Sequence, residues 1–87
     1  MAEKFEEGKL IGKITHYFDK IGVGVIELSD KLKVGDIIRI VGGEVDFDQT
    51  VDSIQIEREE IKEGKKGDSV GLKLNQKVHD GYRVYKV

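Results

Sequence analysis

Short runs of alternating apolar and polar residues, separated by glycines, occupy most of this 87-residue chain. In the first run, residues 9–18, one side carries Leu10, Gly12, Ile14, His16 and Phe18, and the other carries Ile11, Lys13, Thr15 and Tyr17. Successive side chains of a strand point to opposite faces, so a period of two with β-branched and aromatic residues predicts a β-strand. His16 shares a face with Leu10 and Ile14, and we expect it to be partly buried.

Five further runs have the same character and predict strands at residues 23–28, 37–41, 45–56, 69–74 and 82–87. In the longest of them the apolar phase moves by one residue between Val51 and Ile54. Such a shift predicts a β-bulge, which we place near Asp52 and Ser53. Residues 57–68 are charged and contain glycine, so we expect a loop there, with room for one helical turn at 59–63.

Turn-forming pairs precede three of the runs, at Gly35-Asp36, Gly67-Asp68 and Asp80-Gly81. The chain contains 11 glycines and no proline, so glycine and aspartate must make most of its turns. We expect each of these glycines to take the left-handed backbone conformation and each aspartate to cap its turn.

Six predicted strands and no predicted helix leave nothing to cover an open sheet. The sheet must therefore close on itself or pack in two layers. We predict an all-β fold, a small closed six-stranded barrel over residues 9–87, preceded by a flexible acidic tail at 1–8. Because a closed barrel has no free edge, we expect a monomer.

The chain has no cysteine, which excludes disulfides, thiolate metal sites and cysteine nucleophiles. Its first eight residues are acidic and polar, with Phe5 as their one large apolar side chain. Such a segment predicts neither a signal peptide nor a membrane span. These features are typical of a cytoplasmic protein.

Abundant lysine and glutamate, with a single methionine, a single asparagine and no cysteine, is a composition typical of heat-adapted proteins. We therefore predict a thermophilic source and a high melting temperature. Calorimetry that gave a midpoint of about 45–65 °C, the range of mesophilic domains, would contradict this hypothesis.

The net charge of −2 argues against indiscriminate nucleic-acid binding, but the charge is uneven along the chain. Residues 1–30 carry four basic and six acidic side chains (−2), residues 31–60 four and eight (−4), and residues 61–87 seven and three (+4). Lysine and arginine can hold phosphates while tyrosines stack on bases. The candidate residues for binding nucleic acid or another partner are Lys62, Lys65, Lys66, Lys73, Lys77, Tyr82, Arg83 and Tyr85. The alternative is that these lysines only balance the glutamates at 57–63 on a solvated surface.

Two ligand-binding patterns are incomplete. Residues 64–69 contain glycine and lysine, but their spacing differs from that of a phosphate-binding loop and a strand follows them. Residues 46–52, with Glu57 beyond, match most positions of a calcium loop, but Val51 stands where glycine is required. The acidic residues of 46–52 are better explained as a charged strand face that discourages edge pairing.

His16 and His79 are the only histidines, and no carboxylate or nucleophile stands at a catalytic spacing from either. No serine lies in the sequence context of an activated nucleophile. We therefore predict no catalytic residues, no metal ion, no cofactor and no enzymatic activity.

Several runs form one combined pattern: GKI at 12–14, GVGVI at 22–26, LKVGDIIRI at 32–40, GKKGDSVGL at 64–72, and Val78, Gly81 and YRVY at 82–85. Together they resemble a known module, the second domain of translational GTPases such as elongation factor Tu. The resemblance covers residues 9–87 and implies a closed six-stranded, Greek-key-like barrel of the translation-protein type. Related barrels stand at the C-terminus of collagenase-like peptidases, some of which act in tRNA modification. These residues contain no GTPase domain, so we expect no nucleotide-driven switch.

Two functions remain open at this point. In the first, the chain is a non-catalytic translation-factor-like barrel that binds RNA or a ribonucleoprotein through its basic last third. In the second, it is a protein-interaction barrel, an accessory domain for a peptidase-like or tRNA-modification enzyme. A shared fold does not decide between them.

Overall fold

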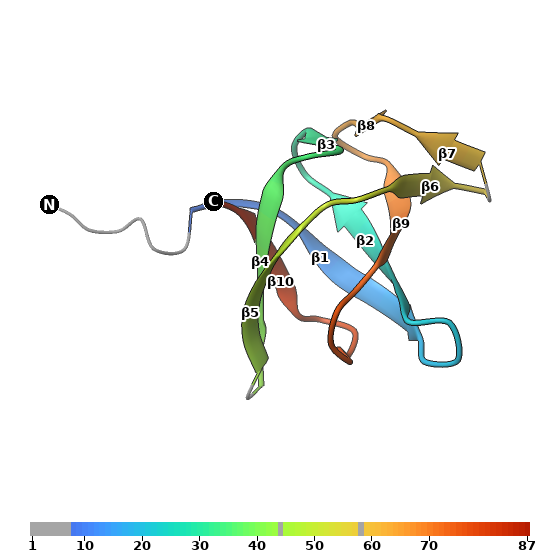
Figure 1. Cartoon of the computed structure of the whole chain (residues 1–87). Coiled ribbons are helices and arrows are strands. Elements are labelled where there is room, and N and C mark those ends of the chain that lie inside the picture. The colour runs from blue at the N-terminus through green and yellow to red at the C-terminus, as the bar shows by residue number, and fades with distance from the viewer. Residues whose placement is uncertain (1–7, 44, 58) are drawn as a thin grey trace, which may run out of the picture.

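The computed structural model describes residues 8–43, 45–57 and 59–87. These residues form ten β-strands and no helix, so none of them belongs to a helix that could cross a membrane (Figure 1). Of the acidic tail predicted at 1–8, only Gly8 lies within the described residues. The strands are β1 (Lys9–Phe18), β2 (Val23–Leu28), β3 (Leu32–Lys33), β4 (Ile37–Gly42), β5 (Val45–Thr50), β6 (Ile54–Ile56), β7 (Glu59–Ile61), β8 (Glu63–Gly64), β9 (Ser69–Lys73) and β10 (Arg83–Lys86).

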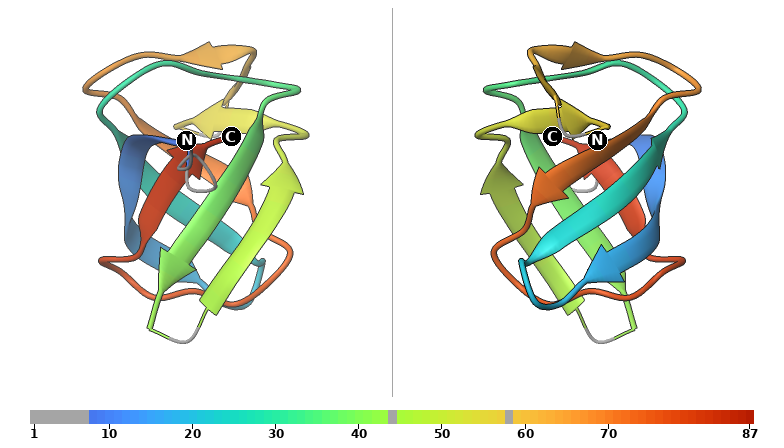
Figure 2. Two further views of the ribbon diagram at one scale, coloured as in Figure 1. Left: turned by 90° about the vertical axis from the view of Figure 1, so that its left-hand side faces the viewer. Right: turned by 90° about the vertical axis from the view of Figure 1, so that its right-hand side faces the viewer.

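Eight of the strands form one antiparallel sheet that curls around a common interior (Figure 2). Their order is β5-β4-β10-β1-β2-β9-β6-β7. β5 and β6 stand near opposite margins of this order, yet only residues 51–53 separate them in the chain. The segment that contains both strands therefore draws the two margins together. The predicted all-β barrel fold is confirmed.

The predicted strand at 45–56 is two strands with a corner between them. The backbone leaves the ladder at 51–53, where Val51 is buried. Its N–H donates to the carbonyl of Asp36 (2.8 Å), and its carbonyl accepts from the N–H of Gly35 (2.8 Å). The ladder is interrupted where the bulge was predicted, but the interruption is a corner between two strands and not a bulge within one. The chain changes partners here, from β4 before the corner to β9 and β7 after it.

Gln49 bridges the seam between β5 and β9. Its side chain is only 8% exposed. The amide nitrogen donates to the carbonyl of Lys73 (2.9 Å), and the amide oxygen accepts from the backbone N–H of Asn75 (2.8 Å). No β5–β9 ladder pairing is recorded among the described strands, so this side chain supplies hydrogen bonds that a ladder would otherwise provide.

Two bulges in β1 change the faces that simple alternation predicts. The register shifts at Ile11 against β10 and at Thr15 against β2. Each extra residue moves the following side chains to the other face. Ile14, between the two bulges, points inward, so Leu10 before the first bulge and His16 and Phe18 after the second are exposed, whereas Ile11 is buried and Tyr17 packs on the core. The prediction that His16 is partly buried is therefore wrong.

The predicted loop at 57–68 contains two short strands and no helical turn. β7 pairs with β6 as a hairpin, and β8 pairs with β3, a strand that the sequence also did not predict. β3 and β8 form a small ladder across one end of the barrel (Figure 1). Glutamate and lysine have low strand propensity, so backbone pairing explains these strands, with the neighbouring β6 for β7 and with the distant β3 for β8.

The turns at 33–36 and 65–68 are built in the same way. In both, the backbone N–H of the first residue donates to the carboxylate of the aspartate in fourth place, over 2.9 Å. The third residue is a glycine with positive φ, 97° at Gly35 and 93° at Gly67. Gly81 has a φ of 92°. The left-handed glycines predicted at all three turns are confirmed, as is the capping by Asp36 and Asp68.

Aliphatic side chains, most of them β-branched, fill the barrel. On β9 and just beyond it, Val70, Leu72 and Leu74 alternate inward. A side chain on Gly24 would place its Cβ 2.6 Å from Cδ1 of Leu74, so this glycine permits a close approach. The buried core consists of Ile11, Ile14, Ile26, Leu28, Leu32, Ile38, Ile40, Phe47, Val51, Ile54, Val70, Leu72, Leu74, Val78 and Val84.

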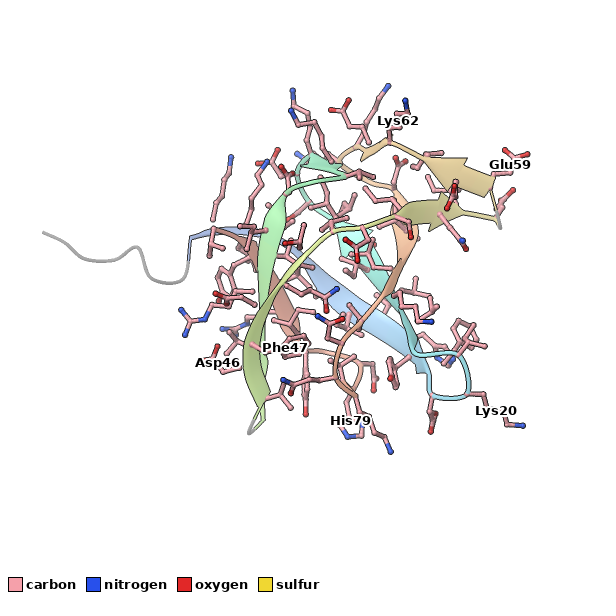
Figure 3. The ribbon with its side chains drawn as sticks, viewed as in Figure 1. Lys20, Asp46, Phe47, Glu59, Lys62 and His79 are labelled. Atoms are coloured by element: carbon pink, nitrogen blue, oxygen red, sulfur yellow. The ribbon has the colours of Figure 1, made fainter. Side chains whose placement is uncertain are left out.

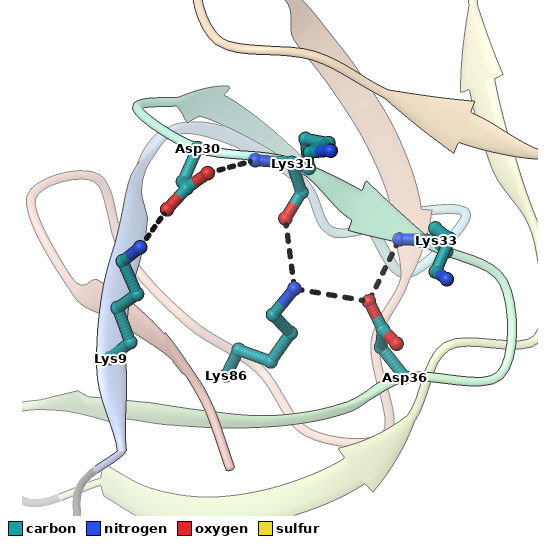
Figure 4. Close-up of polar contacts among 6 residues, drawn as sticks. All are labelled: Lys9, Asp30, Lys31, Lys33, Asp36 and Lys86. Carbon is teal, nitrogen blue, oxygen red and sulfur yellow. Dashed lines mark hydrogen bonds and ion pairs between the residues drawn. The ribbon is translucent and has the colours of Figure 1, made fainter.

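The first and last described residues lie side by side. A side chain at Gly8 would collide with the carbonyl oxygen of Lys86. Nearby, Lys9 pairs with Asp30, and the ammonium group of Lys86 lies 3.8 Å from the carboxylate of Asp36 (Figure 4). These contacts tie both ends of the barrel sequence to the connection at 29–36.

The Gln49 bridge can be tested by replacing Gln49 with leucine, which keeps its size but removes both hydrogen bonds. We expect the free energy of unfolding to fall by about 1–3 kcal/mol, because the Lys73 carbonyl and the Asn75 N–H lose their partner. Urea denaturation measures this change. Gln55→Leu, at an exposed position of β6, is the control and should change stability by less than about 0.5 kcal/mol. Equal effects of the two substitutions would contradict a special role for Gln49.

Candidate functional site

The eight candidate residues are distributed around the barrel. Lys62 lies at the β8 end, whereas Lys77 lines a hollow with His79 at the opposite end (Figure 3). All of the candidate lysines are exposed. By element, Lys62 precedes β8, Lys65 and Lys66 follow it, Lys73 ends β9, Lys77 lies in the loop before β10, Tyr82 adjoins β10, and Arg83 and Tyr85 belong to β10.

Two of the candidates, Lys66 and Arg83, line one pocket together with Lys13. Lys13 on β1 is directly opposite Arg83 on β10. On the other side, the N–H of Gly67 donates to the carbonyl of Leu28 (2.9 Å), which holds the turn carrying Lys66 against β2. The pocket has a volume of about 410 Å³. We call it the cationic pocket and define it by Lys13, Lys66 and Arg83.

The floor of the cationic pocket is apolar because of the first bulge in β1. Ile11 turns into the core there, and its carbonyl accepts a hydrogen bond from the N–H of Ser29 (2.7 Å). Gly12 follows without a side chain, and Leu10 turns outward, 49% exposed, to form one wall. The bulge therefore creates a hollow with an aliphatic surface beneath three cationic side chains. Glu27 is the single acidic residue of its lining.

The three cationic side chains of the cationic pocket make no polar contact within the described part of the fold. No hydrogen bond or ion pair of the Lys13, Lys66 or Arg83 side chain is found there. By contrast, the ammonium groups of Lys9 and Lys86 are engaged by aspartates (Figure 4). Among the described residues, the three cations around the hollow are therefore available to an anionic ligand.

The two candidate tyrosines have different surroundings. Tyr82 lies over the β4–β5 turn, with its ring so close that a side chain on Gly42 would collide with it, and its ring meets His79 edge-on at 5.7 Å. Tyr85 is half-buried on the outer side of β10, opposite Leu10 in the register. Of the two, only Tyr85 is placed beside the cationic pocket.

The two acidic residues of β5 both pair with Arg39 on β4. The guanidinium donates two hydrogen bonds of 2.7 Å to the carboxylate of Asp46, and its Nε lies 3.9 Å from the carboxylate of Asp48. The hydrogen bonds from Arg39 hold the pKa of Asp46 below its ordinary value of 3.8. Among the described residues no three histidines or acidic side chains are grouped to hold a metal ion. Cross-strand charge pairing explains this acidic face.

The two histidines share a hollow that the sequence did not predict. His16 and His79 line a space of about 260 Å³ together with Asp19 and Asp80. Both histidines are exposed, and the ring of His16 meets that of Phe18 edge-on at 4.4 Å. The bulge at Thr15 turns His16 toward this end of the barrel, and alternation alone gives no sign of it.

Lys13 is the site residue that sequence reasoning missed. It belongs to the acidic first third of the chain, so a search for basic segments passes over it. The signal that could have found it is the pairing of the first predicted strand with the last, because that register places Lys13 beside Arg83.

The described residues form a small all-β barrel module whose fold is of the type found in a translation factor and in a peptidase C-terminal domain. The C-terminal domain of a protein described as a U32 peptidase from Geobacillus thermoleovorans has a TM-score of 0.84, with 18% identity over 100% of this chain and 99% of that one. The bacterial selenocysteine-specific elongation factor EF-Sec has a TM-score of 0.70 at 17% identity, covering 99% of this chain and 16% of that protein. At these identities the likeness shows the fold alone.

A curated relative is closer in sequence. A protein named uncharacterized protease from Methanocaldococcus jannaschii is 41% identical over 76 residues, which is 86% of this chain and 19% of that protein. The chain thus spans about a fifth of the length of the relative it matches. No protein-family model matches the sequence. The resemblance to the translation-protein barrel, and to the barrels that accompany peptidases, is confirmed as a resemblance of fold.

The Arg39–Asp46 pair predicts a pH dependence of stability. Because the folded-state pKa of Asp46 is depressed, its contribution is present above the unfolded value of about 3.8 and is lost as the pH falls through the folded value. We expect the stability difference between the native chain and Asp46→Asn to be constant near neutral pH and to shrink below about pH 4. Thermal unfolding across this range measures it. A difference that stayed unchanged down to about pH 2 would contradict the assignment.

Proposed function

We propose that this barrel is a non-catalytic module that binds single-stranded RNA through the cationic pocket. The observation that carries the proposal is the convergence of three unpaired cations on an apolar hollow, at Lys13, Lys66 and Arg83. Phosphate oxygens bind lysine and arginine with little regard to sequence, and base faces pack on apolar and aromatic side chains.

Each part of the surface has a function in this proposal. The three cations contact consecutive phosphates, while a base packs on the aliphatic wall at Leu10 or on the ring of Tyr85. The rest of the chain carries a net negative charge, which confines binding to this patch. The chain acts as a monomer in the cytoplasm, where RNA is available.

A second candidate function is protein interaction, with the barrel as an accessory domain of a peptidase-like protein. The relative from Methanocaldococcus jannaschii favours it, because there the matched segment is a fifth of a larger protein named as a protease. The barrel from Geobacillus thermoleovorans is likewise a C-terminal domain. An apolar protein interface differs from phosphate binding in its weak dependence on salt.

The RNA proposal predicts a defined salt dependence. Three phosphate contacts to a single strand give a slope of roughly −2 in a plot of log affinity against log salt. We expect replacement of Lys13, Lys66 and Arg83 by glutamine to abolish this slope and most of the binding. Fluorescence anisotropy with a labelled single-stranded RNA measures both quantities.

The control is a second triple variant, with glutamine at Lys62, Lys73 and Lys77. It removes the same charge from candidate lysines that lie outside the cationic pocket. We expect it to retain the slope and to lose affinity only a little. Equal losses in the two variants would contradict a localised site, and failure of the native chain to bind RNA at low salt would exclude RNA as the ligand.

A further inference from the structure

The turn end of the β1–β2 hairpin carries apolar side chains that do not pack in the barrel core. Phe18 is 46% exposed and Ile21 is 60% exposed. On β2 the inward positions are filled by Gly24 and Ile26, yet Val23 and Val25 on the outward side are also apolar. None of these four outward side chains belongs to the core cluster or packs against it.

These side chains border a groove because the neighbouring strand, β9, has a glycine beside them. Gly71 on β9 stands directly opposite Val25, and it has no side chain to fill the space between the strands. A Cβ at Gly71 would lie 3.4 Å from Cγ1 of Val23, so the valines overhang the bare backbone. The resulting space is about 440 Å³. We call it the apolar groove and define it by Phe18, Ile21, Val23, Val25 and Gly71. Figure 2, right, shows the face of β1, β2 and β9 on which it lies.

The charge at the β6 end of the apolar groove is negative, whereas the exposed Lys73 stands opposite Val23 at its other end. Glu57 is the single charged residue of its lining, and Glu59 and Glu60 follow on the adjoining β6–β7 hairpin (Figure 3 labels Glu59). All three are exposed, and none has an ion pair or hydrogen bond among the described residues. Glu57 has a φ of 52°, the one positive value for a non-glycine residue in the described chain. This value reflects the place of Glu57 at the turn of the β6–β7 hairpin, because tight hairpin turns take positive φ.

We infer that the apolar groove docks a protein segment that presents an apolar ridge flanked by lysine or arginine. The apolar walls require an apolar ridge, and the unpaired glutamates at one end require cations beside it. The same glutamates disfavour RNA, because phosphate would meet negative charge. The groove therefore differs from the cationic pocket at the open end of the same hairpin, and its function does not depend on RNA binding.

The test uses two synthetic amphipathic peptides with the same leucine and phenylalanine ridge. Lysines flank the ridge in one peptide and glutamates flank it in the other. We expect the lysine peptide to bind the full chain at least about tenfold more tightly than the glutamate peptide at low salt. Glu57→Gln together with Glu60→Gln should remove most of this preference. Fluorescence anisotropy measures each affinity.

Variants of the apolar groove locate the binding. Ile21→Ser with Val25→Ser should weaken the lysine peptide by about tenfold, whereas Val34→Ser, at an apolar residue that is 42% exposed outside the groove, should not. The Lys13, Lys66 and Arg83 triple variant should bind the lysine peptide as the native chain does. That outcome separates this inference from the RNA proposal, because each can fail without the other.

Three results would overturn the inference. The first is equal binding of the two peptides. The second is binding that the serine variants leave unchanged. The third is self-association of the native chain, seen by analytical ultracentrifugation and abolished by Ile21→Ser, since it would make a second copy the occupant of the groove. Unchanged melting temperatures for the exposed substitutions confirm that each variant is folded.

Discussion

The corner at residues 51–53 determines the architecture. Two backbone hydrogen bonds fix it, one from the N–H of Val51 to the carbonyl of Asp36 and one from the N–H of Gly35 to the carbonyl of Val51, and the buried valine side chain anchors it in the core. Before the corner the chain pairs with β4, and after it with β9, so one continuous segment joins both margins of the sheet. Gln49 closes the remaining seam with its side-chain amide. A curled sheet of this size would otherwise leave polar backbone groups unpaired next to an apolar interior.

The sequence predicted the strands better than it predicted their faces. Alternation located the major strands, and the glycine–aspartate pairs located their turns, because both signals are local. The two bulges in β1 leave no shift in the alternation of residues 9–18, so the outward positions of Leu10, His16 and Phe18 could not be read from the pattern. The strands at 59–64 exist through backbone pairing, β7 with the adjacent β6 and β8 with the distant β3, and they oppose the propensity of their residues.

Those unpredicted bulges also shape the surfaces. At Ile11 the extra residue separates the exposed Leu10 from the buried Gly12, and both line the hollow under three cations. At Thr15 the extra residue turns Phe18 outward, beside the apolar groove. Sequence reasoning selected Lys66 and Arg83 from their charge, but it could not separate them from lysines on other sides of the barrel. Long-range register decides which of these side chains share a surface.

The adjacency of Gly8 and Lys86 has a consequence for how such a barrel can be carried by other proteins. Connections made at these two points leave from the same side of the molecule. The barrel can therefore be joined to a larger polypeptide at either point, or inserted within one, without a change in its strand order. The cationic pocket lies near these two points, on β1 and β10, whereas the apolar groove lies at the other end of the β1–β2 hairpin. A barrel whose first and last strands end side by side can be transferred between proteins as a unit. The similar barrels in an elongation factor and in a protein described as a peptidase agree with this property.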